Sequence, residues 1–364
     1  MKTNVWIIAT LLVGGFISSC NQKVETNWYR GNTHAHSTLS DGDTVIGAAV
    51  RWYNDHGYHF LLMSDHNTTS YPENSDSLTL REDFILIPAN EITGEVHFTA
   101  MNVIKPMTYR EIIDKAKEEI TDSLTHRRIV TIVSKAITDA GGIAFVNHPN
   151  FASGVQAEDM MDTENTITHI ELFNGHPYVY NWGKEGHETV ETKWDKMLTG
   201  GKFVYAVASD DTHHYKEMQR MKANPGRGWV MVKADTLSPE SITQAIAKGE
   251  FYASTGVWFD LCEIDNKSLA VTVDIDKTKA EIANRFLFAN EDSIGVEGLL
   301  IETIGKEGSV LSSSMVKQTN GISPIHKYRI SSDDLYARIR ATYCVKEGDI
   351  YKKYYAWTQP LMNK

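Results

Sequence analysis

Histidine, aspartate and glutamate residues recur in short groups between residues 34 and 214 of this 364-residue chain. A single histidine of this kind is usually a capping or surface residue, but repetition along one chain predicts a shared task. Imidazole and carboxylate groups without thiolate suit Zn²⁺, Mn²⁺ or iron better than soft metals. The groups are His34-Ala35-His36, Ser40-Asp41-Gly42, Ser64-Asp65-His66, Asn90-Glu91, Asn147-His148-Pro149, Asn174-Gly175-His176 and Ser209-Asp210-Asp211-Thr212-His213.

The spacing inside two of these groups also favours a metal site. His34 and His36 are separated by one residue, so on an extended segment both imidazoles point to the same side. Asp211 and His213 repeat this spacing at the far end of the region. A shift of one residue would make Asp210 the ligand instead, but the spacing to His213 favours Asp211.

Most of these groups follow directly after a short apolar run. Such nearly continuous apolar runs are typical of buried parallel strands. Between them, the segment before Gly141 has apolar residues at helical spacing, and Thr108-x-x-Glu111 forms a capping box. Alternating strands and helices predict an α/β barrel, in which strand ends meet at one rim. The runs are His59–Met63, Phe84–Ile87, Gly142–Val146, His169–Phe173 and Phe203–Ala208.

The carboxyl-terminal third has a different pattern. Residues 269–275 and 336–343 alternate between apolar and polar side chains, and a Gly348-Asp349 turn precedes an aromatic stretch over 351–357. This pattern predicts a small all-β sandwich over residues 258–364, after a barrel over 27–257. We expect this β-domain to bind a glycan or another protein. Cys262 and Cys344 lie in it, and the sequence leaves open whether they pair or stay as buried thiols.

The amino terminus has the features of a targeting segment. Lys2 precedes an apolar stretch that is too short to span a bilayer, which indicates a signal peptide over residues 1–19. Ile17-Ser18-Ser19-Cys20 resembles a bacterial lipobox, in which the cysteine is lipidated. Residues 20–26 would then be a lipidated tether, and the protein would be anchored in the cell envelope outside the cytoplasm. The alternative is an ordinary secretory signal with an incidental cysteine.

The charge balance excludes one class of partner. The formal net charge is -11, and no basic run is present to neutralise the phosphates of a nucleic acid. We therefore expect no nucleic acid as a delocalised electrostatic partner. A small anionic substrate is compatible with this charge, because a metal site supplies its own local positive charge.

Taken in order, the groups resemble the motifs of the polymerase and histidinol phosphatase (PHP) family. The resemblance covers Asn27 to about Ser254, and it implies a distorted (β/α)₇ barrel that holds up to three divalent metals. Most characterised members of that family are phosphoesterases. The matching blocks are His34-x-His36-Ser37-x-x-Ser40-Asp41-Gly42, Ser64-Asp65-His66-Asn67, Asn90-Glu91-x-x-Gly94-Glu95-Val96-His97, Asn147-His148-Pro149 and Ser209-Asp210-Asp211-x-His213.

The resemblance also implies how the ligands are shared among the metals. Glu91 would bridge two cations, which lets them share a hydroxide that attacks phosphorus. We expect catalysis to depend on Glu91, Asp211 and His213. The implied sets are His34, His36, Glu91 and Asp211 for the first metal, Glu91, His97 and His148 for the second, and Asp41, His66 and His213 for the third.

Two further residues are candidates for substrate binding. Arg227 lies between two glycines. Its guanidinium could bind a phosphate or carboxylate through paired hydrogen bonds, or it could serve as a turn residue. His176 lies near the start of a long segment after residue 173. This segment could form one wall of the substrate site, or it could be a crossover connection with a helix over 190–198.

The sequence thus predicts a metal-dependent phosphoesterase acting on a small phosphorylated substrate with two or three divalent ions. The alternatives are a hydrolase of C–N or other ester bonds and an envelope binding lipoprotein with a vestigial metal site.

Overall fold

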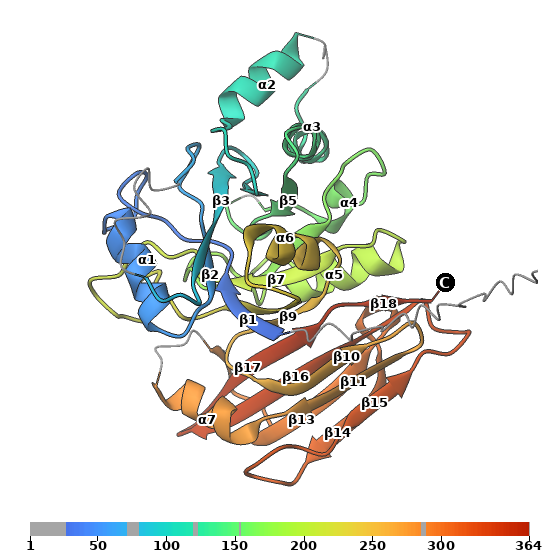
Figure 1. Ribbon diagram of the computed structural model, residues 1–364. Coiled ribbons are helices and arrows are strands. Elements are labelled where there is room, and N and C mark those ends of the chain that lie inside the picture. The colour runs from blue at the N-terminus through green and yellow to red at the C-terminus, as the bar shows by residue number, and fades with distance from the viewer. Residues whose placement is uncertain (1–26, 71–79, 119–122, 153, 285–288, 364) are drawn as a thin grey trace, which may run out of the picture.

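The computed structural model describes residues 27–70, 80–118, 123–152, 154–284 and 289–363. It is a mixed α/β structure in which helices surround the amino-terminal strands and the carboxyl-terminal strands lie beside them (Figure 1). The strands are β1 (Asn27–Asn32), β2 (Phe60–Met63), β3 (Ile85–Ile92), β4 (Phe98–Met101), β5 (Ile143–Val146), β6 (His169–Asn174), β7 (Tyr205–Ser209), β8 (Trp229–Ala234), β9 (Phe251–Ser254), β10 (Phe259–Ile264), β11 (Ser268–Val273), β12 (Asn290–Asp292), β13 (Gly298–Ile304), β14 (Val310–Val316), β15 (His326–Arg329), β16 (Tyr336–Glu347), β17 (Ile350–Thr358) and β18 (Leu361–Met362). The helices are α1 (Ile46–Asp55), α2 (Tyr109–Lys117), α3 (His126–Asp139), α4 (Ala157–Met160), α5 (Val190–Thr199), α6 (Pro239–Ala247) and α7 (Ile275–Asn284), with a 3₁₀ turn at Lys306–Gly308.

The local sequence signals have the expected structures. Each of the predicted apolar runs overlaps a strand, and the helix predicted before Gly141 is α3. The hydroxyl oxygen of Thr108 accepts a hydrogen bond from the amide of Glu111 at 3.2 Å, so Thr108 caps α2, while the Glu111 carboxylate contacts the Thr108 hydroxyl at 2.9 Å rather than completing a capping box. Helix α5 confirms the helical alternative for residues 190–198.

One sheet path runs through most of the chain, in the order β14-β13-β16-β17-β9-β8-β1-β2-β3-β4-β5-β6-β7. Strands β1, β2 and β3 are parallel, as are β5, β6 and β7, whereas β4 is antiparallel to both of its neighbours. The α/β character is therefore confirmed. Among the described residues β7 pairs only with β6, so no continuous ladder closes a barrel. The segments after β1 and β7 nevertheless join through a parallel bridge between Ala35 and Thr212.

Both faces of the amino-terminal strands are buried. In β2, Phe60 and Leu62 join an apolar cluster with α6, whereas Leu61 and Met63 join a second cluster with α1. This explains why the strand has no polar alternation. A strand buried on both faces has its polar residues concentrated at its ends, and this is where the candidate ligands lie.

The carboxyl-terminal part contains two sheets that share one apolar cluster. Strands β10, β11 and β15 form a three-stranded sheet, and Val271 on β11 lies in the same cluster as Ile301 and Ile339 on the large sheet. Helix α7, which the sequence pattern did not predict, interrupts the strands. Because β17 pairs with β9, the large sheet crosses the predicted domain boundary at residues 257 and 258. The division into two domains at that position stays a prediction.

Two further predictions from the sequence concern the amino-terminal segment and the cysteines. The predicted signal peptide, Cys20 and the tether lie outside the described residues. In the described ranges, no helix has the length and apolarity needed to cross a bilayer. Cys262 and Cys344 are both buried and free, so they do not form a disulfide.

Candidate metal centre

The candidate ligands meet at the end of the sheet where the parallel strands have their carboxyl ends. His34 and His36 follow β1, His66 follows β2, His148 follows β5, and Asp211 follows β7. Glu91 lies within the longer strand β3, beside an isolated bridge to His66. Residues that are far apart in the sequence therefore contribute side chains to one rim.

The reversal of β4 explains how His97 reaches the same rim. His97 immediately precedes β4, and this strand is antiparallel to β3 and β5. The amino end of β4 consequently lies beside the carboxyl ends of its neighbours. The backbone carbonyl of His97 accepts a hydrogen bond from the amide of Asn147 at 3.0 Å, which fixes it next to His148.

Four ligand atoms of the first group surround one position. The Nε2 atoms of His34 and His36 lie 3.0 Å apart, which agrees with the expectation that their side chains point the same way. Asp211 Oδ1 lies 3.3 and 3.1 Å from these two nitrogens, and Glu91 Oε2 lies 3.3 and 3.5 Å from them. All four side chains are almost completely buried.

A second group uses the other oxygen of Glu91. His97 Nδ1 and His148 Nε2 each lie 3.2 Å from Glu91 Oε1. The same oxygen accepts a hydrogen bond from Asn147 Nδ2 at 2.9 Å, which orients the carboxylate. One carboxylate therefore faces two groups of imidazoles, the arrangement expected of a bridging ligand.

The third group is more exposed. Asp41 lies 3.3 Å from His66 and 3.2 Å from His213, measured between carboxylate oxygens and Nε2 atoms, and His36 belongs to this group as well. The Asp41 side chain is 53% exposed, compared with 1% for Glu91 and 6% for Asp211. This group therefore borders solvent, while the first two groups are enclosed.

The donor set fits divalent cations. One ligand atom from every residue lies within 4.8 Å of the others in each of three sets: His34, His36 and Asp211; Glu91, His97 and His148; and His36, Asp41, His66 and His213. Glu91 Oε2 is buried and faces imidazole nitrogens, with His66 Nδ1 at 2.8 Å and the Nε2 atoms of His34 and His36 at 3.3 and 3.5 Å. An anionic oxygen surrounded by imidazole nitrogens is satisfied by a cation at their common centre.

The electrostatics of the centre point in the same direction. Burial lowers the pKa of His34, but Asp211 and Glu91 outweigh it and raise this pKa well above the ordinary value. Burial likewise opposes ionisation of Glu91, yet His34 and His97 hold its pKa well below the ordinary value. Despite burial, Asp41 and Glu91 raise the pKa of His66 to about 10. At His36, by contrast, burial and the neighbouring His213 lower the pKa to about 4, so the carboxylates favour positive charge at His34 and His66 but not at every imidazole.

Glu171, on β6, contacts the candidate ligands, whereas the sequence analysis includes it only as part of an apolar run. Its Oε1 lies 2.7 Å from His34 Nδ1 and accepts a hydrogen bond from the Ser209 hydroxyl at 2.6 Å. Its Oε2 accepts from the amide of His148 and from Asn174 Nδ2. A carboxylate on Nδ1 leaves Nε2 of His34 to act as a ligand. A lone acidic residue inside the His169–Phe173 run was the available signal.

The structure separates the roles of Asp210 and Asp211. Asp210 accepts hydrogen bonds from the backbone amides of Gly226, Arg227 and Gly228 and from the Tyr53 hydroxyl, so it holds a loop. Asp211 instead faces His34 and His36. The register favoured by the spacing to His213 is therefore the one in which Asp211 reaches the cluster.

The two substrate-binding candidates have different surroundings. Arg227 is fully buried, and its guanidinium donates to the backbone carbonyls of Gly175 and Gln219 at 2.7 and 2.8 Å. The structure therefore favours the alternative reading of Arg227 as a structural residue, because its donors are directed at the backbone. His176 lies at the rim, with its ring 5.5 Å from the ring of His213, and burial lowers its pKa to about 4.

Two candidate ligands have left-handed backbones. The φ angles are 26° for His148 and 51° for Asp211, a region that residues other than glycine seldom adopt. Such conformations cost of order 1 kcal/mol and persist where the surrounding structure imposes them, commonly at functional sites. They turn the chain sharply after β5 and β7, so that both side chains point toward the cluster.

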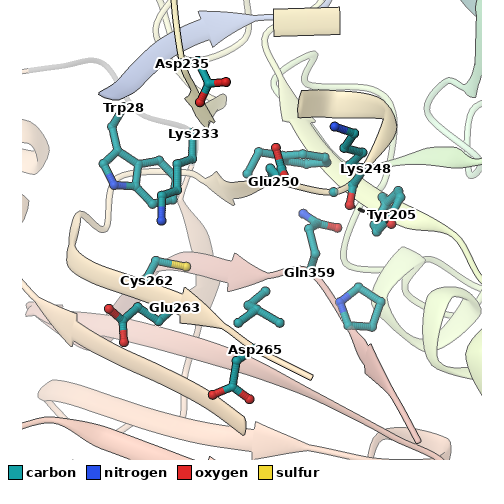
Figure 2. A pocket seen from close by; sticks show the side chains of 14 residues that line it. Trp28, Tyr205, Lys233, Asp235, Lys248, Glu250, Cys262, Glu263, Asp265 and Gln359 are labelled. Carbon is teal, nitrogen blue, oxygen red and sulfur yellow. Dashed lines mark hydrogen bonds between the residues drawn. The ribbon is translucent and has the colours of Figure 1, made fainter. Parts of the chain in front are cut away.

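A separate cavity of about 700 Å³ lies at the opposite end of the strands. Figure 2 shows Trp28, Tyr205, Lys233 and Glu250 on one side of it and Cys262 on the other. These residues come from the starts of β1 and β7, from around β8 and β9, and from β10. No candidate metal ligand lines this cavity, so the two sites are distinct.

Comparison with known proteins finds similarity to solved structures only. No family model matches this chain, and no curated protein matches it. One similar structure is a two-domain protein from Bacteroides vulgatus ATCC 8482 containing a predicted PHP-like metal-dependent phosphoesterase, with a TM-score of 0.42, 12% identity, and coverage of 87% of this chain and 90% of that one. Another is an amidohydrolase from Chromobacterium violaceum with bound sulfate and no metal, with a TM-score of 0.35, 13% identity, and coverage of 51% and 88%. The case for a function therefore rests on the geometry of the site itself.

Proposed function

We propose that this chain is a metal-dependent phosphoesterase whose centre holds two or three divalent ions, Zn²⁺, Mn²⁺ or iron. The observation that carries the proposal is the position of Glu91 between two imidazole groups, with Oε2 near His34 and His36 and Oε1 near His97 and His148. A carboxylate shared between two cations would hold them close together, and paired cations can stabilise the attacking and leaving oxygens of phosphoryl transfer. The order of the motifs along the sequence, which resembles that of the PHP family, supports the same class of reaction.

The residues of the chain divide this work. His34, His36, Glu91 and Asp211 would hold the first ion, and Glu91 with His97 and His148 the second. Asp41, His66 and His213 would hold a third. Divalent ions at these positions would lower the pKa of water and screen the charge of a phosphoryl group.

The other side chains orient this set. Glu171 and Asn147 fix His34 and Glu91 through hydrogen bonds of 2.7 and 2.9 Å. Asn174 Nδ2 donates to Asp211 Oδ2 at 3.1 Å, which leaves Oδ1 for the cluster. Because the first two groups are enclosed and the Asp41 group is exposed, the substrate would approach from the side of Asp41 and His213. A small phosphorylated molecule fits this approach.

An activity screen with metal analysis tests the proposal. Purified protein should hydrolyse a phosphomonoester or phosphodiester, lose the activity in a chelator, and regain it with Mn²⁺ or Zn²⁺. Turnover of an amide or carboxylic ester without any phosphoester hydrolysis would favour the hydrolase of C–N or other ester bonds. Ligand binding with no turnover under any divalent metal would favour an envelope binding protein with a vestigial site.

We also propose that Cys20 is lipidated and that the protein is anchored in the cell envelope outside the cytoplasm. The support is the lipobox-like Ile17-Ser18-Ser19-Cys20 after a short apolar stretch. A small phosphorylated substrate would then be met outside the cytoplasm. Binding of a glycan or protein by the carboxyl-terminal strands is part of the same proposal.

A further inference from the structure

Exposed aromatic side chains border the metal centre. Phe151 is 39% exposed, and its ring lies 5.1 Å from that of His148 and 5.6 Å from that of His97. Tyr178 is 51% exposed, and its ring lies 5.6 Å from that of His176, which in turn lies beside His213. These rings continue outward from the candidate ligands onto the surface.

The loops that carry these aromatics are fixed to each other. Asn150 is fully buried, and its Nδ2 donates to the carbonyls of Tyr180 and Glu188, both at 2.9 Å. Lys184 Nζ donates to the carbonyl of Ala152 at 3.1 Å from the opposite loop. The loop after β5 therefore holds Phe151 at a set position relative to the loop after β6, which carries Tyr178.

Lys184 lies on the same loop as Tyr178, which with Phe151 forms the pair of rim aromatics, and its Nζ donates to the carbonyl of Ala152 and lies 4.3 Å from the ring centre of Tyr180. Lys193 is buried and donates to the carbonyls of Pro149 and Val155, and Arg227 donates to the carbonyl of Gly175. The ion pairs of the described ligand carboxylates are all with histidines. Lys184, Lys193 and Arg227 thus all donate to backbone carbonyls, and the surface beside the candidate ligands is formed by the exposed rings of Phe151 and Tyr178.

We propose that the rim aromatics bind the organic group of the substrate, and that this group contains a planar aromatic ring attached through a single phosphoryl group. This inference rests on the proposed function, because the phosphoryl group would lie at the metal centre. An aromatic ring that stacks on, or meets edge-on, a fixed aromatic side chain gains about two- to tenfold in affinity per contact. Phe151 and Tyr178 are then specificity-determining residues.

The test compares two phosphonates that cannot be hydrolysed. Phenylphosphonate and methylphosphonate share the charged group and differ in the ring. Their dissociation constants are measured by calorimetry on the metal-loaded full-length protein. We expect phenylphosphonate to bind roughly tenfold more tightly. Phe151→Ala and Tyr178→Ala should each reduce that preference several-fold, with a smaller change for methylphosphonate.

The matched control is Phe203→Ala. Phe203 is 37% exposed, similar to Phe151, but it lies just before the amino end of β7, whereas the candidate ligands follow the carboxyl end. This variant should keep the full preference. If Phe151→Ala disturbs the adjacent ligands, Tyr178→Ala still decides, because the ring of Tyr178 lies beside that of His176, which is not a candidate metal ligand. Equal affinity for both phosphonates, or an unchanged preference in Tyr178→Ala, overturns this inference alone. Failure of both phosphonates to bind overturns it together with the proposed function.

Discussion

Replacing Glu171 with glutamine should weaken metal binding without creating a cavity in the core. The carboxylate of Glu171 accepts from the His148 amide and Asn174 Nδ2 at one oxygen, and contacts His34 Nδ1 and Ser209 Oγ at the other. A glutamine amide group at the first position would face two N–H donors. At the second position it would donate to His34 Nδ1, which moves the imidazole proton to Nε2. Either orientation damages the site, and the second removes the ligand atom of His34.

The expected magnitude follows from the role of Glu171 in orienting a ligand. Loss of such a partner typically costs about 10- to 100-fold in metal affinity, or roughly 1.4 to 2.7 kcal/mol. Titration of metal-free protein with Mn²⁺ or Zn²⁺, followed by calorimetry or a competing chelator, measures this directly. Activity should recover in part at high metal concentration, because the ligands themselves remain.

Ser209→Ala is the matched control. It removes one hydrogen bond to Glu171 but leaves the carboxylate on His34 Nδ1. Its loss of metal affinity should be clearly smaller than that of Glu171→Gln. Wild-type affinity in a folded Glu171→Gln protein would refute the reasoning, since both orientations of the amide would then be harmless.

Further predictions concern the cluster, the fold and the anchor. Glu91→Gln should lower kcat far more than it raises KM, and it should reduce the metal content. His213→Ala should mainly weaken substrate binding. Steady-state kinetics and metal analysis of both variants measure these effects. Burial lowers the pKa of His169 to about 4 in the folded protein, so the unfolded chain, with a pKa of about 6.5, binds more protons as the pH falls. About 2 kcal/mol of stability should therefore be lost between pH 7 and pH 5, and denaturant unfolding of His169→Gln should lack this loss. Cys20→Ser should move the protein from the membrane fraction to the soluble fraction with turnover unchanged; retention in the membrane would contradict lipidation.

The elements predicted from sequence were those with strong local signals. The apolar run of β5 and the amphipathic pattern of α3 each specify their element without reference to the rest of the chain. Strand β1 was not predicted, because Arg30 and Asn32 interrupt its apolar pattern. Arg30 is buried there by a partner distant in sequence: its Nη2 lies 3.1 Å from Glu281, and its guanidinium lies 3.9 Å from the ring centre of Trp229. Such contacts exist only in the folded chain.

The direction of β4 is a second feature that local sequence does not contain. The rule that ligands follow strands finds His66 and His148, but His97 comes before its strand. Only the pairing of β4 between β3 and β5 places that residue at the rim. The resemblance to the PHP motifs supplied His97 because a family pattern contains this topology implicitly. Glu171 lies outside those motifs, so the sequence does not predict it as a site residue although it contacts His34 directly.

Asp210 and Asp211 are adjacent in one turn but have different surroundings: Asp210 binds backbone amides, and Asp211 faces the candidate ligands. In a regular strand, successive side chains point to opposite faces, so only one of the two could face the cluster. The left-handed backbone at Asp211, with φ of 51°, turns the chain immediately after β7 and directs this carboxylate toward His34 and His36. Asp210 is left facing the 226–228 loop, whose amides it binds at 2.6 to 2.8 Å. That loop carries Arg227, whose guanidinium donates to the carbonyl of Gly175 at the base of the segment leading to His176. The carboxylate outside the cluster thus helps to fix the position of the rim, which explains why both aspartates are buried in the same turn.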